Sequence, residues 1–154
     1  MGSLAVRIAL LDETPATTRY EDLNRMWFAA LALLPVAVLL LYLGLRNELT
    51  AGGHGGAVAA IIGSAAAAAG NATEFQYDND QGFMLFALGT VIFSLGMVGF
   101  GVALHSRSPA RVATAVAAIG PLGFLTTIAG PIGIAAGAMF AAAWVVVGFG
   151  RSQG

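Results

Sequence analysis

The chain contains two histidines, His54 and His105, which are its candidate ligands for a metal ion or a haem iron. Imidazole is the commonest metal ligand among side chains. Both histidines lie at the ends of apolar segments, and neither has a carboxylate nearby at the spacing of a metal site. If the segment 51–70 crosses a membrane, the two lie on the same side and could bind one cofactor together; otherwise they lie on opposite sides. We expect no metal and no cofactor, and keep haem or pigment binding as a weak third hypothesis.

Residues 71–81 form a polar, acidic stretch in which aromatic side chains alternate with carboxylates. Its acidic and aromatic members are Glu74, Phe75, Tyr77, Asp78 and Asp80. The stretch lacks the glycine and the terminal glutamate of an EF-hand calcium loop. We expect a solvated external loop whose surface is suited to docking a partner.

Several hydroxyl-bearing residues lie inside apolar segments. They are Thr90, Ser94, Thr114, Thr126 and Thr127. Within a bilayer, such hydroxyls bond to their own helix backbone or across to a neighbouring helix. Contact with a polar ligand is the alternative, and we expect helix packing.

Other kinds of chemistry are excluded by residue types that the chain lacks. It has no cysteine, which excludes thiolate metal sites and cysteine catalysis, and no lysine, which excludes a Schiff base. Its seven basic residues are all arginine and form no patch that could bind nucleic acid. No phosphate-binding loop and no serine nucleophile elbow occurs. We predict that the protein is not an enzyme and does not bind nucleic acid.

The long apolar segments of the chain contain no ionisable residue. Charged groups inside a membrane are costly to bury and usually mark proton relays, ion pathways or voltage sensors. Their absence argues against all three mechanisms.

The composition predicts an all-α integral membrane protein of the cell membrane, surrounded by the lipid bilayer. Hydrophobic residues make up 58% of the chain and charged residues 10%, whereas soluble domains carry about a quarter charged residues. One helical crossing takes about 20 apolar residues. The uncharged stretch 112–150 is too long for a single crossing and is expected to fold back at Gly130 and Pro131. The predicted crossings are about 26–45, 82–104, 112–129 and 131–149.

The segment 51–70 is ambiguous because alanine contributes little to insertion and a glycine cluster leaves few helical residues. We predict a four-helix transmembrane bundle with an additional short Ala/Gly-rich helix here, which could be a fifth crossing. One transmembrane domain, 26–150, follows an interfacial or disordered arm, 1–25, and precedes a short tail, 151–154. Trp27 and Tyr42 stand near opposite ends of the first crossing, as in an aromatic belt. We find no internal repeat.

Orientation follows from the rule that loops rich in Arg face the cytoplasm. Four crossings place six of the seven arginines on the cytoplasmic side and leave Arg46 outside. Five crossings give four arginines inside and three outside. The sequence therefore favours four crossings, with the N and C termini both cytoplasmic.

Small residues recur at a spacing of four on two segments. The stripes are Gly56, Ala60, Ser64 and Ala68, and Ala129, Gly133, Gly137 and Ala141. Small residues let helix backbones approach closely. These stripes are expected to pack helices, either within the chain or against another subunit.

These patterns lead to three functional hypotheses. The first is a non-catalytic accessory or scaffolding subunit of a membrane complex, which packs through uncharged small-residue helix faces. Its partners would be other membrane subunits. The alternative is a small homo-oligomeric transporter or channel-like protein for a neutral or apolar solute, and the weakest is the haem- or pigment-binding protein.

Overall fold

The structure, a computed structural model, describes residues 18–75, 77, 79, 81–127 and 131–150. Within these residues it has five α-helices, one 3-10 turn and no strand, so the all-helical prediction is confirmed. The elements are α2 (Thr18–Leu45), η1 (Arg46–Glu48), α3 (Ala51–Phe75), α4 (Gln81–Leu104), α5 (Ala110–Leu125) and α6 (Pro131–Phe149). Most of the predicted N-terminal arm, the tail 151–154 and the predicted hinge residue Gly130 lie outside the described residues.

Four stretches of the described chain are long and apolar enough to cross a membrane. They are Trp27–Glu48, Ala51–Phe75, Gln81–Leu104 and Pro131–Phe149. These are not the four segments that the sequence favoured. The doubtful segment 51–70 belongs to a 25-residue helix, whereas the predicted crossing 112–129 contributes α5, which has 16 residues.

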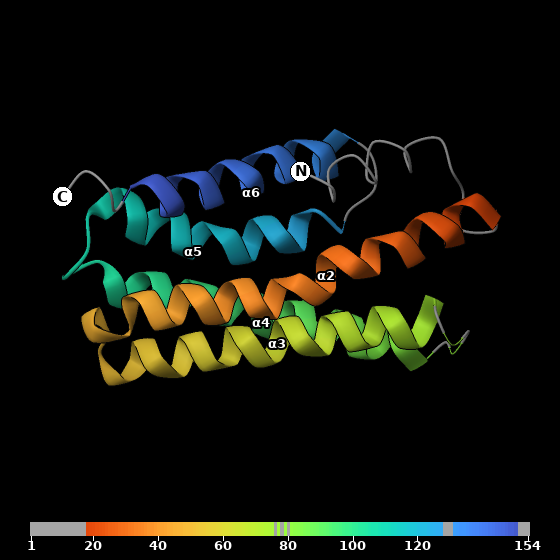
Figure 1. Ribbon diagram of the computed structural model, residues 1–154, viewed down its shortest axis with the longest axis horizontal. Helices are drawn as coiled ribbons and strands as arrows, with labels where there is room; N and C mark the ends of the chain where they lie inside the picture. Colours follow the sequence, from red (N-terminus) through yellow and green to blue (C-terminus); the bar gives the residue numbers. More distant parts are fainter. Residues whose placement is uncertain (1–17, 76, 78, 80, 128–130, 151–154) are drawn as a thin grey trace.

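Consecutive helices run antiparallel and lie side by side (Figure 1). For α2 and α3, the Tyr42 hydroxyl lies 3.1 Å from Nδ1 of His54 at one end. At the other end, Nε of Arg25 donates a hydrogen bond to the carbonyl oxygen of Phe75. Because the five helices alternate in direction, α2 begins and α6 ends at opposite ends of the bundle (Figure 1).

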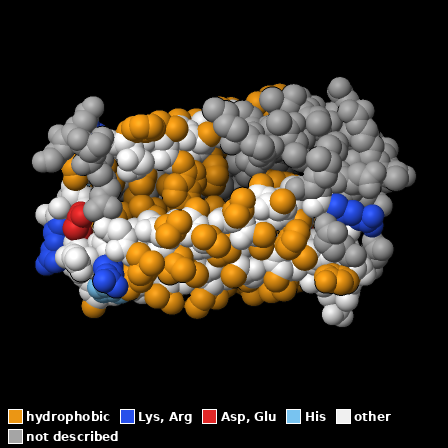
Figure 2. Space-filling view, viewed as in Figure 1, with side chains coloured by type: hydrophobic (Ala, Val, Ile, Leu, Met, Phe, Trp, Pro, Cys, Tyr) orange, Lys and Arg blue, Asp and Glu red, His pale blue; other side chains and the backbone are white. Residues whose placement is uncertain are grey.

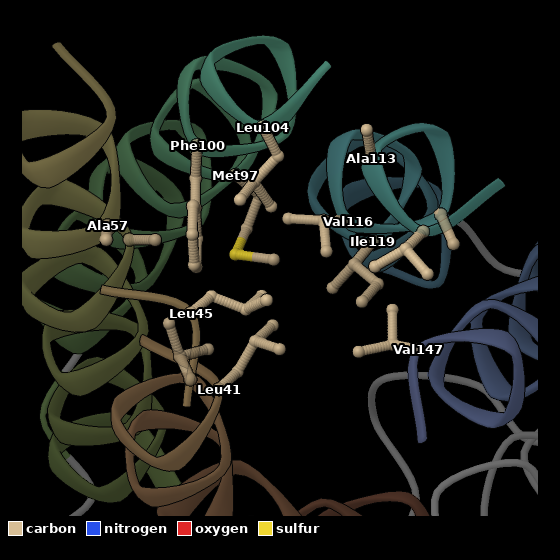
Figure 3. Close-up of a cluster of buried hydrophobic side chains, with 14 of the residues drawn as sticks. Leu41, Leu45, Ala57, Met97, Phe100, Leu104, Ala113, Val116, Ile119 and Val147 are labelled. Atoms are coloured by element: carbon tan, nitrogen blue, oxygen red, sulfur yellow. The ribbon is translucent and has the colours of Figure 1, made fainter. Parts of the chain in front are cut away.

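The buried apolar side chains concentrate in the half of the bundle where α2 ends and α3 begins. Leu45 of α2, Met97 and Phe100 of α4, and Val116 and Ile119 of α5 are all fully buried there. Figure 3 shows their side chains converging from three helices on one interior space. This half of the bundle is therefore filled by the chain's own side chains.

The outer surface is apolar along its length and charged at its ends. Figure 2 shows hydrophobic side chains over the middle of one face, with arginine, glutamate and histidine side chains gathered toward the ends. The first long helix alone exposes Leu33, Leu40 and Leu43. Such a belt suits a lipid environment, because in water it would be a large aggregation-prone patch.

Two polar contacts join neighbouring elements at one end of the bundle. At the end where α2 finishes, the Ser108 hydroxyl between α4 and α5 donates a hydrogen bond to Glu48 of η1. At the same end, Arg111 of α5 donates a 3.2 Å hydrogen bond to the carbonyl oxygen of Gly150, just after α6. The first contact joins η1 to the turn between α4 and α5, and the second joins α5 to the end of α6.

Candidate functional site

The closest helix contact in the described chain joins α3 and α4 through facing glycines. A Cβ built on Gly63 would lie 2.7 Å from the carbonyl oxygen of Gly89, and a Cβ on Gly89 would lie 2.7 Å from the carbonyl oxygen of Gly63. Real Cβ atoms essentially never approach so closely. Only a residue without a side chain fits at either position.

The same reciprocal contact recurs one heptad along in both directions. Gly56 faces Gly96 at 2.9 and 2.8 Å, and Gly70 faces Gly82 at 2.8 and 2.5 Å, measured from each ideal Cβ to the opposite carbonyl oxygen. Glycines seven residues apart stay on one helix face because seven residues make about two turns. The three pairs hold α3 against α4 along most of their length.

Sequence analysis missed this heptad pattern and found no repeat. The signal was present: glycines stand at 56, 63 and 70, and again at 82, 89 and 96. In the second set, a phenylalanine follows each glycine four residues later, at 86, 93 and 100. A search for small residues at a spacing of four finds Gly56 but misses Gly63 and Gly70.

The structure places the small-residue stripes as follows. On α3, Gly56 and Ala60 lie against the backbone of α4, and Ser64 is buried and donates a 2.9 Å hydrogen bond to the carbonyl oxygen of Ile61. On α6, Gly133 and Gly137 are buried and Ala141 is half-buried. The remaining member of that stripe, Ala129, lies outside the described residues.

The half of the bundle opposite the filled core contains two pockets. An outer pocket of about 370 Å³ and an inner pocket of about 80 Å³ lie there, between α2, α3, α4 and α5. The two pockets share the lining residues Trp27, Phe86, Thr90 and Thr127. The two pockets are therefore adjacent.

Trp27 faces this space and not an aromatic belt at the surface. Its side chain is only 6% exposed, which corrects the sequence interpretation. It lies in the half of α2 that precedes Pro35, and Figure 1 shows this half diverging from α3. A proline inside a helix removes one backbone hydrogen bond and usually bends the helix. The divergence leaves room between α2 and its neighbours for the pockets.

Hydroxyl groups that are distant in sequence are brought together around the inner pocket. Ser64, Thr90, Thr126 and Thr127 all line it. Each of the three threonines donates its hydroxyl hydrogen to a carbonyl oxygen of its own segment, at 2.6–2.7 Å. Because the donors are used in this way, the hydroxyl oxygens can offer the pocket only lone pairs. The other two hydroxyls noted in the sequence, Ser94 and Thr114, do not line these pockets.

Asn71 is the buried polar side chain that sequence analysis missed. It is 3% exposed, lines the outer pocket, and its Oδ1 has no hydrogen-bond partner in the structure. A buried amide oxygen without a partner is costly, by roughly 1–3 kcal/mol. The sequence assigned Asn71 to a loop, but α3 continues to Phe75 and so holds Asn71 inside the bundle.

The predicted docking loop is shorter than expected, because α3 continues into it. Glu74 and Phe75 belong to the last turn of α3 and line the outer pocket. Tyr77 is 79% exposed. Asp78 and Asp80 lie outside the described residues.

The two histidines lie at the same end of the bundle, where α3 begins and α4 ends. The rings of His54 and Tyr42 meet edge to face with their centres 5.7 Å apart, and His105 is exposed. Across the part of the chain that the structure describes, no group of three or more His, Asp or Glu residues could hold a metal ion.

Comparisons with protein-family models, curated proteins and solved structures find no match to this chain. The site must therefore be interpreted from its own geometry.

Proposed function

We propose that the protein is a multi-pass protein of the cell membrane that serves as a non-catalytic accessory or scaffolding subunit of a membrane complex. The observation that carries this proposal is the outward face of α3. Its exposed residues include Gly52, Gly55, Ala65 and Ala69, with Val58 and Ile62 as the only large ones in this helix.

This face differs from the outward faces of the neighbouring helices. α4 exposes Leu88, Val91 and Leu95, which are well suited to lipid tails. α3 is the least apolar of the four long helices. In a bilayer, helices associate through close packing of small residues, since lipid tails solvate large apolar side chains equally well. A small-residue face on a weakly apolar helix therefore favours a second helix over lipid.

The orientation that we propose has all five helices crossing the membrane, including the 16-residue α5, which is shorter than the other four but runs alongside α4 and α6 (Figure 1). Arg46, Arg107 and Arg111 lie at the end of the bundle where α2 finishes, whereas Arg19 and Arg25 lie in the part of α2 at the other end. The rule for basic loops then puts the arginine-rich end in the cytoplasm. The earlier expectation of two cytoplasmic termini requires an even number of crossings, so it does not fit five antiparallel helices that all cross.

A photo-crosslinking amino acid tests the docking face. Placed at the exposed Ala65 of α3 in cells, it should form an adduct with another membrane protein, which mass spectrometry identifies. The matched control is Leu95 of α4, which is 68% exposed and should crosslink to lipid.

Two outcomes would contradict the accessory role. Lipid adducts from both positions would leave α3 without a protein partner. Adducts between two copies of this chain at Ala65, with no other protein, would favour the homo-oligomeric transporter. Native mass spectrometry of the protein purified in mild detergent gives an independent measurement of the partner's mass.

A further inference from the structure

We infer that the adjacent outer and inner pockets are a binding site for a small neutral amphiphile with a flat apolar body and one hydroxyl or N–H donor. The inference does not depend on the accessory role, because the site lies within a single chain. It rests on the size of the pockets, the chemistry of their walls and the unpartnered oxygen of Asn71.

The size of the space fits a small organic molecule. Ligand sites commonly enclose about 300–1,000 Å³, and an apolar cavity of about 150 Å³ is enough for benzene. The outer pocket has a volume of about 370 Å³. Two of its lining residues, Phe83 and Phe124, are exposed at the surface of the bundle, so a molecule dissolved in lipid could enter from the side.

The walls favour a flat apolar body. Aromatic side chains from four helices, Trp27, Phe75, Phe86 and Phe124 among them, line the outer pocket. Aromatic rings bind other rings favourably in offset or edge-to-face geometry, beyond the contribution of buried area. The inner pocket adds Phe93 and Phe140, with aliphatic side chains from α2.

The site offers a ligand mainly hydrogen-bond acceptors, since its hydroxyl and amide oxygens outnumber its donors, which are the amide nitrogen of Asn71 and the indole nitrogen of Trp27. The threonine hydroxyls already donate within their own segments, and the oxygen of Asn71 is an acceptor without a partner. Glu74, which also lines the outer pocket, already takes part in another interaction. A ligand with a donor satisfies the oxygen of Asn71, whereas a ligand with only acceptors can accept from the amide nitrogen of Asn71 but leaves the oxygen unpaired.

The placement of Asn71 sets the orientation of the ligand. It lies one turn before α3 ends at Phe75, near the end of the bundle where α3 finishes. The inner pocket extends in the opposite direction, toward Leu34 and Phe93 in the middle of the bundle. The donor of the ligand would therefore lie near the membrane surface, and its apolar body would lie deeper between the helices.

The experiment compares 2-naphthol with 2-methoxynaphthalene, which share the same rings but differ in the hydroxyl hydrogen. Trp27 reports binding by fluorescence quenching, in a Trp144→Phe background that removes the other tryptophan of the chain. In lipid vesicles, 2-naphthol should quench Trp27 saturably and bind about tenfold more tightly than the methyl ether, since one hydrogen bond is lost.

The variant Asn71→Leu should remove this preference, so that the two compounds bind with equal affinity. The control Asn47→Leu, at an exposed asparagine at the other end of the bundle, should preserve it. Equal affinities in the unaltered site, quenching that never saturates, or a tenfold preference that persists in Asn71→Leu would each overturn the inference. The ligand comparison does not require a variant at Asn71, so it remains decisive if Asn71→Leu fails to fold.

Discussion

Gly63 of α3 and Gly89 of α4 face each other so closely that a Cβ on either one would lie 2.7 Å from the carbonyl oxygen of the other. In glycine, a hydrogen on Cα occupies the direction of the missing side chain. Each glycine therefore presents a Cα–H group to the backbone of the opposite helix, which includes the carbonyl oxygen of its partner, and Cα–H···O contacts between helices are weakly stabilising. The contact depends on the absence of a side chain at both positions.

We predict that Gly63→Ala destabilises the protein. The added methyl group must push the two backbones apart along a contact that is tight at three successive glycine pairs. Overpacking of this kind costs about 1–3 kcal/mol. The measurement is the free energy of unfolding in mixed detergent micelles, followed by far-UV circular dichroism.

Gly55→Ala is the matched control, because a Cβ at that position meets nothing within 4 Å. It should leave stability unchanged or raise it by about 0.5–1 kcal/mol, since alanine loses less conformational freedom than glycine in a helix. If the two variants prove equally stable, the glycine pairs do not control the α3–α4 distance.

Much of the fold was predictable from the sequence, because long uncharged runs have few alternatives to apolar helices. The runs 26–45, 82–104 and 131–149 correspond to the apolar part of α2, to α4 and to α6. The segment 51–70 was not predictable in the same way, because alanine distinguishes poorly between lipid and water. The helix that contains this segment packs against α4 through its glycines. In the sequence, this contact is visible only when glycines are compared at a spacing of seven residues.

The pockets were harder to predict from the sequence than the helices were. Thr90, Thr126 and Thr127 were recognised as polar groups in apolar segments, but their convergence depends on how α4 and α5 pack. Asn71 was assigned to an acidic loop because charged residues follow it closely. Its burial results from the continuation of α3 beyond residue 70, which the local composition does not indicate.

The number of crossings is testable with single cysteines, since the chain has none of its own. Asn47 and Tyr77 are exposed and lie at opposite ends of α3. If α3 crosses, an impermeant thiol reagent applied to intact cells should label Tyr77→Cys and not Asn47→Cys. A cysteine at the exposed Ser106 should be protected together with Asn47→Cys. Labelling at both ends of α3 would show instead that the segment stays outside.

The hydrogen bond from Ser108 to Glu48 predicts a further difference in stability. It joins η1 to the turn between α4 and α5, and Glu48 is half-buried. Ser108→Ala should lower the free energy of unfolding by about 1 kcal/mol, the usual net contribution of one intramolecular hydrogen bond. Ser106→Ala, at an exposed neighbour, should have little effect in the same unfolding measurement. Equal stability of the two variants would mean that solvent replaces the bond without loss.

Phe100→Ala tests whether the filled half of the bundle is held by packing. Phe100 is fully buried beside Met97 and Leu45, whereas Leu95 on the same helix is 68% exposed. In soluble proteins, Phe→Ala in a core costs about 3–5 kcal/mol, partly through lost transfer from water. In a membrane, lipid and the protein interior solvate an apolar side chain equally well. The free energy of transfer therefore contributes little to the loss of stability, and the cost of the cavity remains. Phe100→Ala should therefore cost less than this range but clearly more than Leu95→Ala, measured as free energies of unfolding in lipid bicelles. Similar losses for the two variants would mean that the filled half gains no stability from its packing.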